Sequence, residues 1–176
     1  WPIHRPRRIG DHIVENPQWE TRPFSDAWYY SIRVRWGTVE VELLHDKVYM
    51  GYDTDYVQDF NMSDGYNHVL FNVVQTWGPW EGRLGVGPMI VHPEGTVTTE
   101  DGSYLIGYLG APSWRVGGIG FQGSVGYRGR LWEGLSYIAE GKMTTAIVHL
   151  TYPEPVREVY APVTGYHVLV GVGYDL

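Results

Sequence analysis

Charged residues of this chain recur at alternate positions, and this spacing bears directly on their chemistry. Glu140 and Lys142 are separated by one residue, as are Glu40 and Glu42. Successive side chains of a strand point to opposite faces, so each pair shares one face of an extended segment. We expect carboxylates and cations on such a face to form ion pairs if the face is buried. The residues assigned to this charged face are Arg33, Arg35, Glu40, Glu42, Arg83, Arg128, Glu140, Lys142 and His167.

Other combinations that could do chemistry are few. Asp53, Asp55, Asp59 and Asp64 lie close together, and carboxylate oxygens are ligands for Ca²⁺. Their spacing departs from that of an EF-hand loop, so we expect an ordinary acidic loop. The chain has no Cys, which excludes disulfides and thiolate metal sites. No nucleophile–base spacing and no Gly-rich phosphate loop stands out in the sequence.

The elements that must position the charged residues are strands with one apolar face. In the segment 135–143, Leu135, Tyr137 and Met143 share one face, while Glu140 and Lys142 share the other. Similar alternation recurs in six further segments, and it predicts an antiparallel sheet. The predicted strands are 28–36, 39–44, 68–77, 83–90, 118–128, 135–150 and 165–174, and the predicted long loops are 48–64, 94–116 and 152–162.

Residue types indicate which face of this sheet points to the interior and which points outward. The charged face also carries many glycines, which a narrow barrel interior needs and a solvent-facing sheet does not. The chain has 8 Trp and 14 Tyr but only 4 Phe, and Trp and Tyr favour membrane interfaces. We therefore predict that the apolar face turns outward to lipid, with an aromatic girdle at the strand ends. The predicted lipid-facing aromatics are Trp28, Trp36, Trp77, Tyr127, Tyr137, Tyr166 and Tyr174.

The predicted fold class is all-β, an antiparallel up-and-down transmembrane β-barrel of about eight strands, with seven readable in the chain. Residues 1–26 are predicted to be an N-terminal loop segment, and residues 27–176 the barrel domain. Single-chain bacterial barrels have even strand numbers, so an upstream strand or another protein chain must close the seam. A soluble lipocalin-like carrier with the two faces reversed is the alternative fold. The net charge of −7 argues against a nucleic-acid partner.

Several stretches of the chain resemble a group of eight-stranded outer-membrane proteins related to lipid A oxidase. The resemblance covers roughly residues 28–175, and two positions depart from the group's pattern: Asp46 stands where a Tyr is usual, and Asp64 where a His is usual. The matching stretches are VEVELLHDKVYM (39–50), FNMSDGYNHVLFNVV (60–74), GRLGVGPMIVHPEG (82–95), GGIGFQGSVGYR (117–128), AEGKMTT (139–145) and GYHVLVGVGY (165–174).

This resemblance implies the bacterial outer membrane as location, and outer-membrane lipid and lipopolysaccharide as partners. For an enzyme it implies oxygen-dependent oxidation of lipid A at the outer leaflet. Glu42, His45, His92 and Glu140 would then lie near the sugar, with a divalent metal held by imidazole and carboxylate. Our leading expectation is a structural or interaction protein of the outer membrane, in a larger assembly that closes the seam. A lipid A-modifying enzyme and a soluble ligand carrier are the alternatives.

Overall fold

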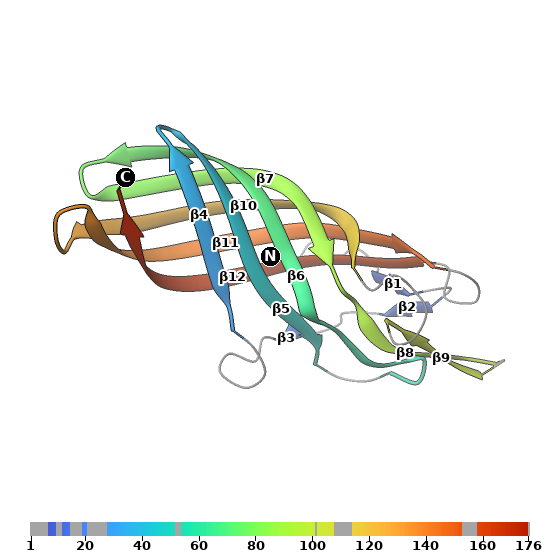
Figure 1. Ribbon diagram of the computed structural model, residues 1–176. Helices are drawn as coiled ribbons and strands as arrows, with labels where there is room; N and C mark the ends of the chain where they lie inside the picture. The colour runs from blue at the N-terminus through green and yellow to red at the C-terminus, as the bar shows by residue number, and fades with distance from the viewer. Residues whose placement is uncertain are drawn as a thin grey trace.

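The computed structural model describes residues 7–9, 12–14, 19–20, 28–51, 54–100, 102–107, 114–152 and 158–175. These residues form a single antiparallel sheet of twelve strands and no helix (Figure 1). None of the described residues belongs to a helix that could span a membrane. The seven long strands are β4 (Tyr30–Trp36), β5 (Val39–Met50), β6 (Val57–Trp77), β7 (Trp80–Val91), β10 (Arg115–Arg130), β11 (Leu135–Thr151) and β12 (Glu158–Tyr174).

The long strands follow one another around the sheet in chain order, from β4 to β12. Tight turns join β4 to β5, β6 to β7 and β10 to β11, and all three lie at the same end as the C-terminus, here called the turn end (Figure 1). Gly37, Gly78 and Gly134 have φ angles of 60°, 62° and 73°, which glycine adopts without strain. The opposite end, with the longer connections, is called the loop end.

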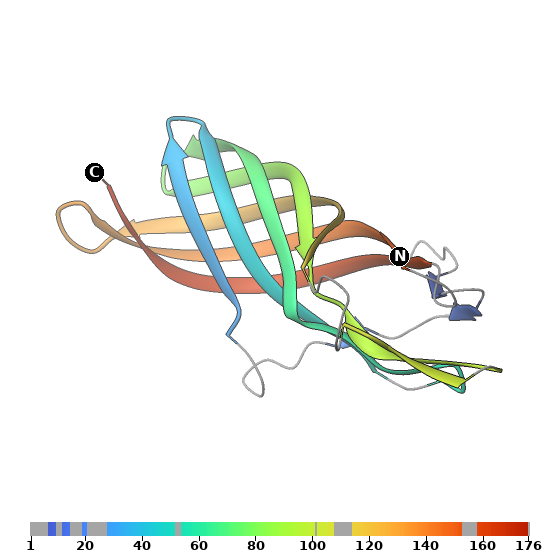
Figure 2. The same ribbon diagram turned by 45° about the vertical axis from the view of Figure 1, so that its right-hand side comes forward.

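Five short strands lie at the loop end. β8 (Glu94–Thr99) and β9 (Gly102–Ile106) form a hairpin that pairs with the start of β6 and projects beyond the long strands (Figure 2). β1 (Arg7–Ile9) and β2 (His12–Val14) form a second hairpin, and β1 pairs with β12. β3 (Trp19–Glu20) pairs with the end of β5.

The polar face of the sheet is buried and the apolar face is exposed. On β11, Glu140 and Lys142 are 3% and 4% exposed, whereas Tyr137 and Met143 are 38% and 46% exposed. The same alternation follows β4, β5, β7 and β10. The sheet curls so far that Arg33 on β4 contacts Glu140 on β11. Burial therefore agrees with the predicted orientation of the two faces.

The interior has two zones. At the loop end it is an apolar core, in which Phe60, Met62, Val97, Ile106 and other residues of β5, β6, β7, β8, β9, β11 and β12 pack together. Toward the turn end the interior is polar and charged, with buried Glu, Arg and Lys side chains. The β8–β9 hairpin is therefore held to the sheet by apolar packing as well as by strand pairing.

The predicted loops were too long. β5 runs on to Met50, β6 already begins at Val57 within the predicted loop 48–64, and β12 begins at Glu158 within the predicted loop 152–162. The predicted loop 94–116 holds the β8–β9 hairpin and the first residues of β10. Three short strands also occur within residues 1–26, which were predicted to be loop. The alternation that marks a strand fails in the β6 extension because Asp59 has a φ of 51° and the pairing register shifts between Gln58 and Asn61.

Candidate functional site

The centre of the polar interior is a cluster of buried ion pairs around two carboxylates. Lys142 Nζ contacts Glu42 and lies 3.5 Å from Glu140 Oε1. Arg33 donates to both oxygens of Glu140 at 2.8 Å, and its Nε lies 3.1 Å from Glu42 Oε1. The side chains of Glu42, Glu140 and Lys142 are fully buried. The cluster links β4, β5 and β11 across the interior.

A second group of ion pairs extends toward the turn end. Arg83 Nε lies 3.1 Å from Glu40 Oε1, and its Nη1 lies 3.1 Å from Glu140 Oε2. Its Nη2 lies 2.5 Å from Glu81, which also accepts a hydrogen bond from Arg35 at 2.9 Å. Glu81 is absent from the predicted network, although its spacing from Arg83 places it on the same face of the strand. Alternation alone could therefore have identified it.

Positive and negative charges balance in this network. Arg128 closes its turn end, with Nη2 2.8 Å from Asp175 and Nη1 3.7 Å from Glu81. Among the described residues the network joins five cations, Arg33, Arg35, Arg83, Arg128 and Lys142, to five carboxylates, Glu40, Glu42, Glu81, Glu140 and Asp175.

Neutral side chains supply further hydrogen bonds to the carboxylates. Asn72 donates to Glu40 at 3.0 Å and to Glu42 at 3.1 Å. Gln122 donates to Glu42 at 2.6 Å, and Ser31 donates to the other oxygen of Glu42 at 2.6 Å. Buried charges are tolerated when their remaining hydrogen-bonding capacity is filled in this way. Glu42 is thus fully engaged as an acceptor, which leaves it poorly suited to act as a general base.

His68 and His167 lie on the loop-end side of the charge network. His167 Nε2 is 2.9 Å from the Thr144 hydroxyl and 3.6 Å from Asp46 Oδ2. His68 is fully buried, its ring meets that of Tyr66 edge-on at 5.2 Å, and neither ring nitrogen has a hydrogen-bond partner among the described residues. His167 was predicted to belong to the charge network. Its contacts join it to Asp46, which was not named there.

The four predicted catalytic residues lie in three different places. Glu42 and Glu140 belong to the buried ion pairs, whereas the side chain of His45 leaves β5 on the opposite face from Glu42. His45 stacks on Tyr30 at 4.8 Å, and its Nδ1 lies 2.6 Å from Asn67 Oδ1. The fourth residue, His92, follows the end of β7 and is buried at the loop end.

His92 has its own surroundings at the loop end. Its ring stacks on Trp114 at 5.3 Å, and its Nδ1 lies 3.9 Å from Glu94. Within the described part of the chain, no three His, Asp or Glu side chains are placed to hold a metal ion together. Asp53 of the acidic segment lies outside the described residues. The catalytic and metal assignments therefore stay predictions.

The inner face of the sheet changes from charged to apolar along the strands. In β12 the outward residues from Tyr166 to Tyr174 are apolar, and the inward ones include Gly165, His167 and Gly171. Closer to the loop end of β12, the inward residues Val159, Ala161 and Val163 are apolar and buried instead. β11 changes in the same way, from inward Glu140 and Lys142 to inward Ala146, Val148 and Leu150. The outward residues beside this apolar zone are mixed, because polar Thr164 and His149 occur together with the exposed apolar residues Ile147 and Val116. The outward apolar side chains around the charged zone are called the apolar band.

Aromatic rings stand at both borders of this band. On β12, Tyr166 and Tyr174 are 78% and 68% exposed. Trp28 and Trp36 flank β4 in the same manner and are also strongly exposed. Of the seven aromatics predicted to face lipid, Trp28, Trp36, Trp77, Tyr137, Tyr166 and Tyr174 are exposed, and Tyr127 is half-buried against Trp80 and Tyr137.

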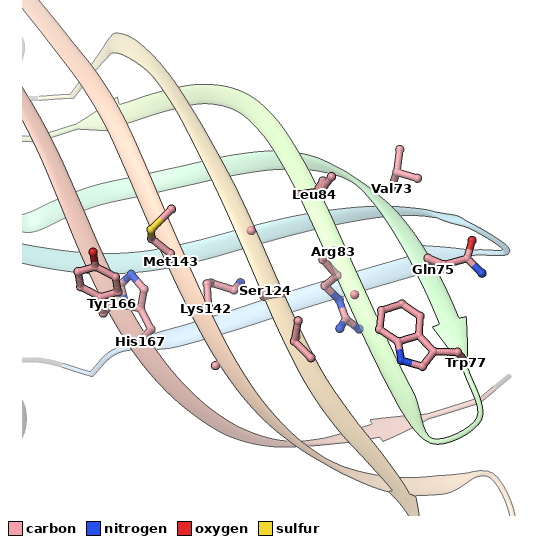
Figure 3. Close-up of a pocket in the computed structure, with 14 residues that line it drawn as sticks. Val73, Gln75, Trp77, Arg83, Leu84, Ser124, Lys142, Met143, Tyr166 and His167 are labelled. Atoms are coloured by element: carbon pink, nitrogen blue, oxygen red, sulfur yellow. The ribbon is translucent and has the colours of Figure 1, made fainter. Parts of the chain in front are cut away.

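The band also contains a shallow groove of about 840 Å³ over β6, β7, β10, β11 and β12 (Figure 3). Leu84 and Arg83 leave β7 on opposite sides of the sheet, so Leu84 borders the groove while Arg83 points to the interior (Figure 3). Three outward glycines widen the groove, since they carry no side chain. The residues that border it on the outer face include Val73, Trp77, Gly82, Leu84, Gly123, Val125, Gly141, Met143 and Tyr166.

Comparisons of this chain with protein-family models, with curated proteins and with solved structures find no match in any of the three.

Proposed function

We propose that this protein is a small bacterial outer-membrane β-barrel with a structural or interaction role in that membrane. The observation that carries the proposal is the band of exposed apolar side chains around a buried, charged interior. Near Gly165 the interior becomes apolar, and polar residues such as Thr164 join the outer face. A protein surrounded by water throughout has no physical reason to bury charges and expose an apolar band, because exposed apolar surface is costly in water. A boundary between lipid and water along the strands accounts for it.

The length of the band supports a membrane-spanning role. Tyr166 and Tyr174 delimit nine residues of β12, and Trp28 and Trp36 delimit nine positions at β4. Eight steps of 3.4 Å give about 27 Å, and transmembrane strands have about 9–11 residues with a tilt of about 45°. Aromatic rings at both borders are typical of outer-membrane barrels. The strand extensions and the β8–β9 hairpin would then stand outside the bilayer.

The interior favours a plugged barrel over a pore or a carrier. Arg83, Glu42, Glu140 and Lys142 are almost fully buried and contact one another or a common partner. A pore would need water in this space, and a lipocalin-like carrier would need an apolar cavity there. The predicted carrier, with its two faces reversed, is therefore not favoured by the burial of the charges. A rigid, filled barrel suits a structural or interaction role.

Outer-membrane lipid and lipopolysaccharide are the partners that this proposal implies. The groove bordered by Leu84, Met143 and Tyr166 is almost wholly apolar, and a lipid acyl chain is of suitable chemistry to fill it. A lipid A-modifying activity is not proposed as a second function. Its predicted residues His45 and His92 lie in separate surroundings from Glu42 and Glu140.

The proposal is tested first by fractionating the native cells and by comparing the electrophoretic mobility of unheated and heated protein. We expect the protein in the outer-membrane fraction, solubilised only by detergent, with a mobility that shifts on heating. Trp28 and Trp36 should then be quenched by lipids brominated near the headgroup more strongly than by lipids brominated at the end of the acyl chain. A folded monomer in detergent-free buffer would refute the proposal.

A deletion strain separates the proposed role from an enzymatic one. The mass spectrum of lipid A from cells that lack this protein should be unchanged, whereas the loss of an oxidised species would establish the lipid A-modifying alternative. Chains that co-purify with the protein in mild detergent would identify the assembly in which it takes part.

A further inference from the structure

The two edge strands of the curled sheet run in the same direction. Seven long strands, each antiparallel to the next, lead from β4 to β12, so β4 and β12 both run from the loop end to the turn end. Among the described residues, β4 pairs only with β5, and the part of β12 beyond Tyr160 pairs only with β11. The interval between these two edges is called the seam.

Side-chain exposure indicates that a neighbour belongs at the seam. Val168 and Val170 on β12 are 87% and 82% exposed. Val86 and Val125, which also face outward but have a strand on each side, are 41% and 54% exposed. Gly171 faces the interior with nothing within 4 Å of the position of a Cβ atom, so there is room for an inward side chain beside it.

The direction of the edges restricts what can close the seam. A strand that runs from the turn end to the loop end is antiparallel to both β4 and β12, and it satisfies both rows of backbone groups. In lipid such groups must be satisfied, because no water is available to bond them. A second copy in the same membrane has the same orientation, so its β4 or β12 would meet this seam in parallel. The geometry therefore favours a single strand over a second copy.

β1 shows where this strand enters. Arg8 pairs with Tyr160 and Ile9 with Val159, antiparallel to β12 and on its seam side. β3 pairs with Tyr49 and Met50 of β5, on the same edge of β5 that β4 occupies closer to the turn end. The N-terminal segment thus contacts both sides of the seam at the loop end. A strand that continues β1 backwards along β12 runs in the required direction.

Resting on the proposed function, we propose that the seam is filled by a strand of this same polypeptide that precedes Trp1 in the full-length protein and continues β1. The proposed strand keeps the β1 register: Tyr174 lies fourteen residues after Tyr160, so its partner in this register lies fourteen residues before Arg8. The seven residues directly before Trp1 therefore face the seven residues Val168–Tyr174. The first, third, fifth and seventh residues before Trp1 face outward and are apolar.

The test uses the protein extracted from its native membrane, because the expected strand precedes Trp1. N-terminal sequencing and intact mass should find at least seven residues before Trp1, with the predicted alternation. The chain has no native Cys, so introduced cysteines report pairing cleanly. A cysteine at the third residue before Trp1 should form a disulfide with Val170→Cys. A matched cysteine at the second residue, which faces the interior, should not.

Several outcomes would overturn this inference. A mature chain with fewer than seven residues before Trp1 would show that this polypeptide lacks the proposed strand. A cross-link from Val170→Cys to a different protein would show that another chain closes the seam. Equal cross-linking by the two matched cysteines would refute the β1 register. In each case, recovery from the outer membrane with heat-shifted mobility would leave the proposed function standing. Recovery as a soluble monomer would remove both proposals.

Discussion

Replacing one buried carboxylate tests whether the charge network holds the fold together. In the variant Glu42→Gln an amide of the same shape replaces a carboxylate whose side chain is fully buried and which contacts Lys142 and Arg33. Removal of one partner of a buried ion pair costs about 3–5 kcal/mol, because the other charge stays buried. Lys142 and Arg33 both retain Glu140, so we expect a loss of about 3 kcal/mol, the lower end of this range.

The partner variant Lys142→Met completes a double-mutant cycle. It should also lose about 3 kcal/mol, because it leaves Glu42 with less compensating charge. The double variant removes both charges, and a buried pair replaced by neutral groups of similar volume is often close to neutral in stability. We therefore expect the double variant to lose no more than about 3 kcal/mol, which gives a coupling energy of at least about 3 kcal/mol.

The assay is reversible urea unfolding in lipid vesicles, followed by the fluorescence of the 8 Trp residues at a constant m-value. The matched control is Glu158→Gln, which removes an exposed carboxylate 3.1 Å from His149 and should cost less than about 1 kcal/mol. If Glu42→Gln cost no more than this control, or if the two single losses simply added in the double variant, the reasoning about buried pairing would be wrong.

Three further changes test other parts of the structure. Val170→Arg should lower the stability in vesicles by about 2–4 kcal/mol, because Val170 lies at the centre of the apolar band. Thr164→Arg, beyond the band, should cost about 0–1 kcal/mol. Equal losses would contradict the position of the band. Gly87→Ala should prevent efficient folding, because its Cβ would lie 1.8 Å from a backbone oxygen. The control Gly141→Ala meets nothing within 4 Å and should fold normally. Folding of both variants is judged by the shift in mobility on heating. Phe60 is 1% exposed, so Phe60→Ala should lower the stability by about 3–5 kcal/mol. Proteases should then cleave the loop end, while the electrophoretic mobility still shifts on heating. Unchanged proteolysis would refute the apolar core.

Predictions from local spacing agreed with the structure wherever one strand decides the outcome. The alternation in 135–143 predicted a strand with Glu140 and Lys142 on one face, and β11 has that arrangement. The glycines and paired charges predicted that this face is the inner one, and Glu140 and Lys142 are buried. Loop lengths were less well predicted, since β8 and β9 carry no sustained alternation of polarity.

Contacts between distant strands could not be read in this way. Arg33 and Glu140 are separated by 107 residues, and their bidentate contact depends on the curl of the whole sheet. His45 and Glu42 are three residues apart on β5, so their side chains point to opposite faces of the strand. The family resemblance had placed them near the same sugar. His92 lies beyond the end of β7, where the stack with Trp114 is set by tertiary packing.

By itself, the sequence determined the all-β class, the central parts of the seven long strands and the side of the sheet that residues in those parts face, because side-chain alternation is a local property of a strand. Only the tertiary structure decided which charges meet, where the interior changes from charged to apolar, and that β4 and β12 remain edges running the same way. These features depend on strand stagger and curvature, which arise from pairing and packing over the whole sheet and leave no local pattern in the chain.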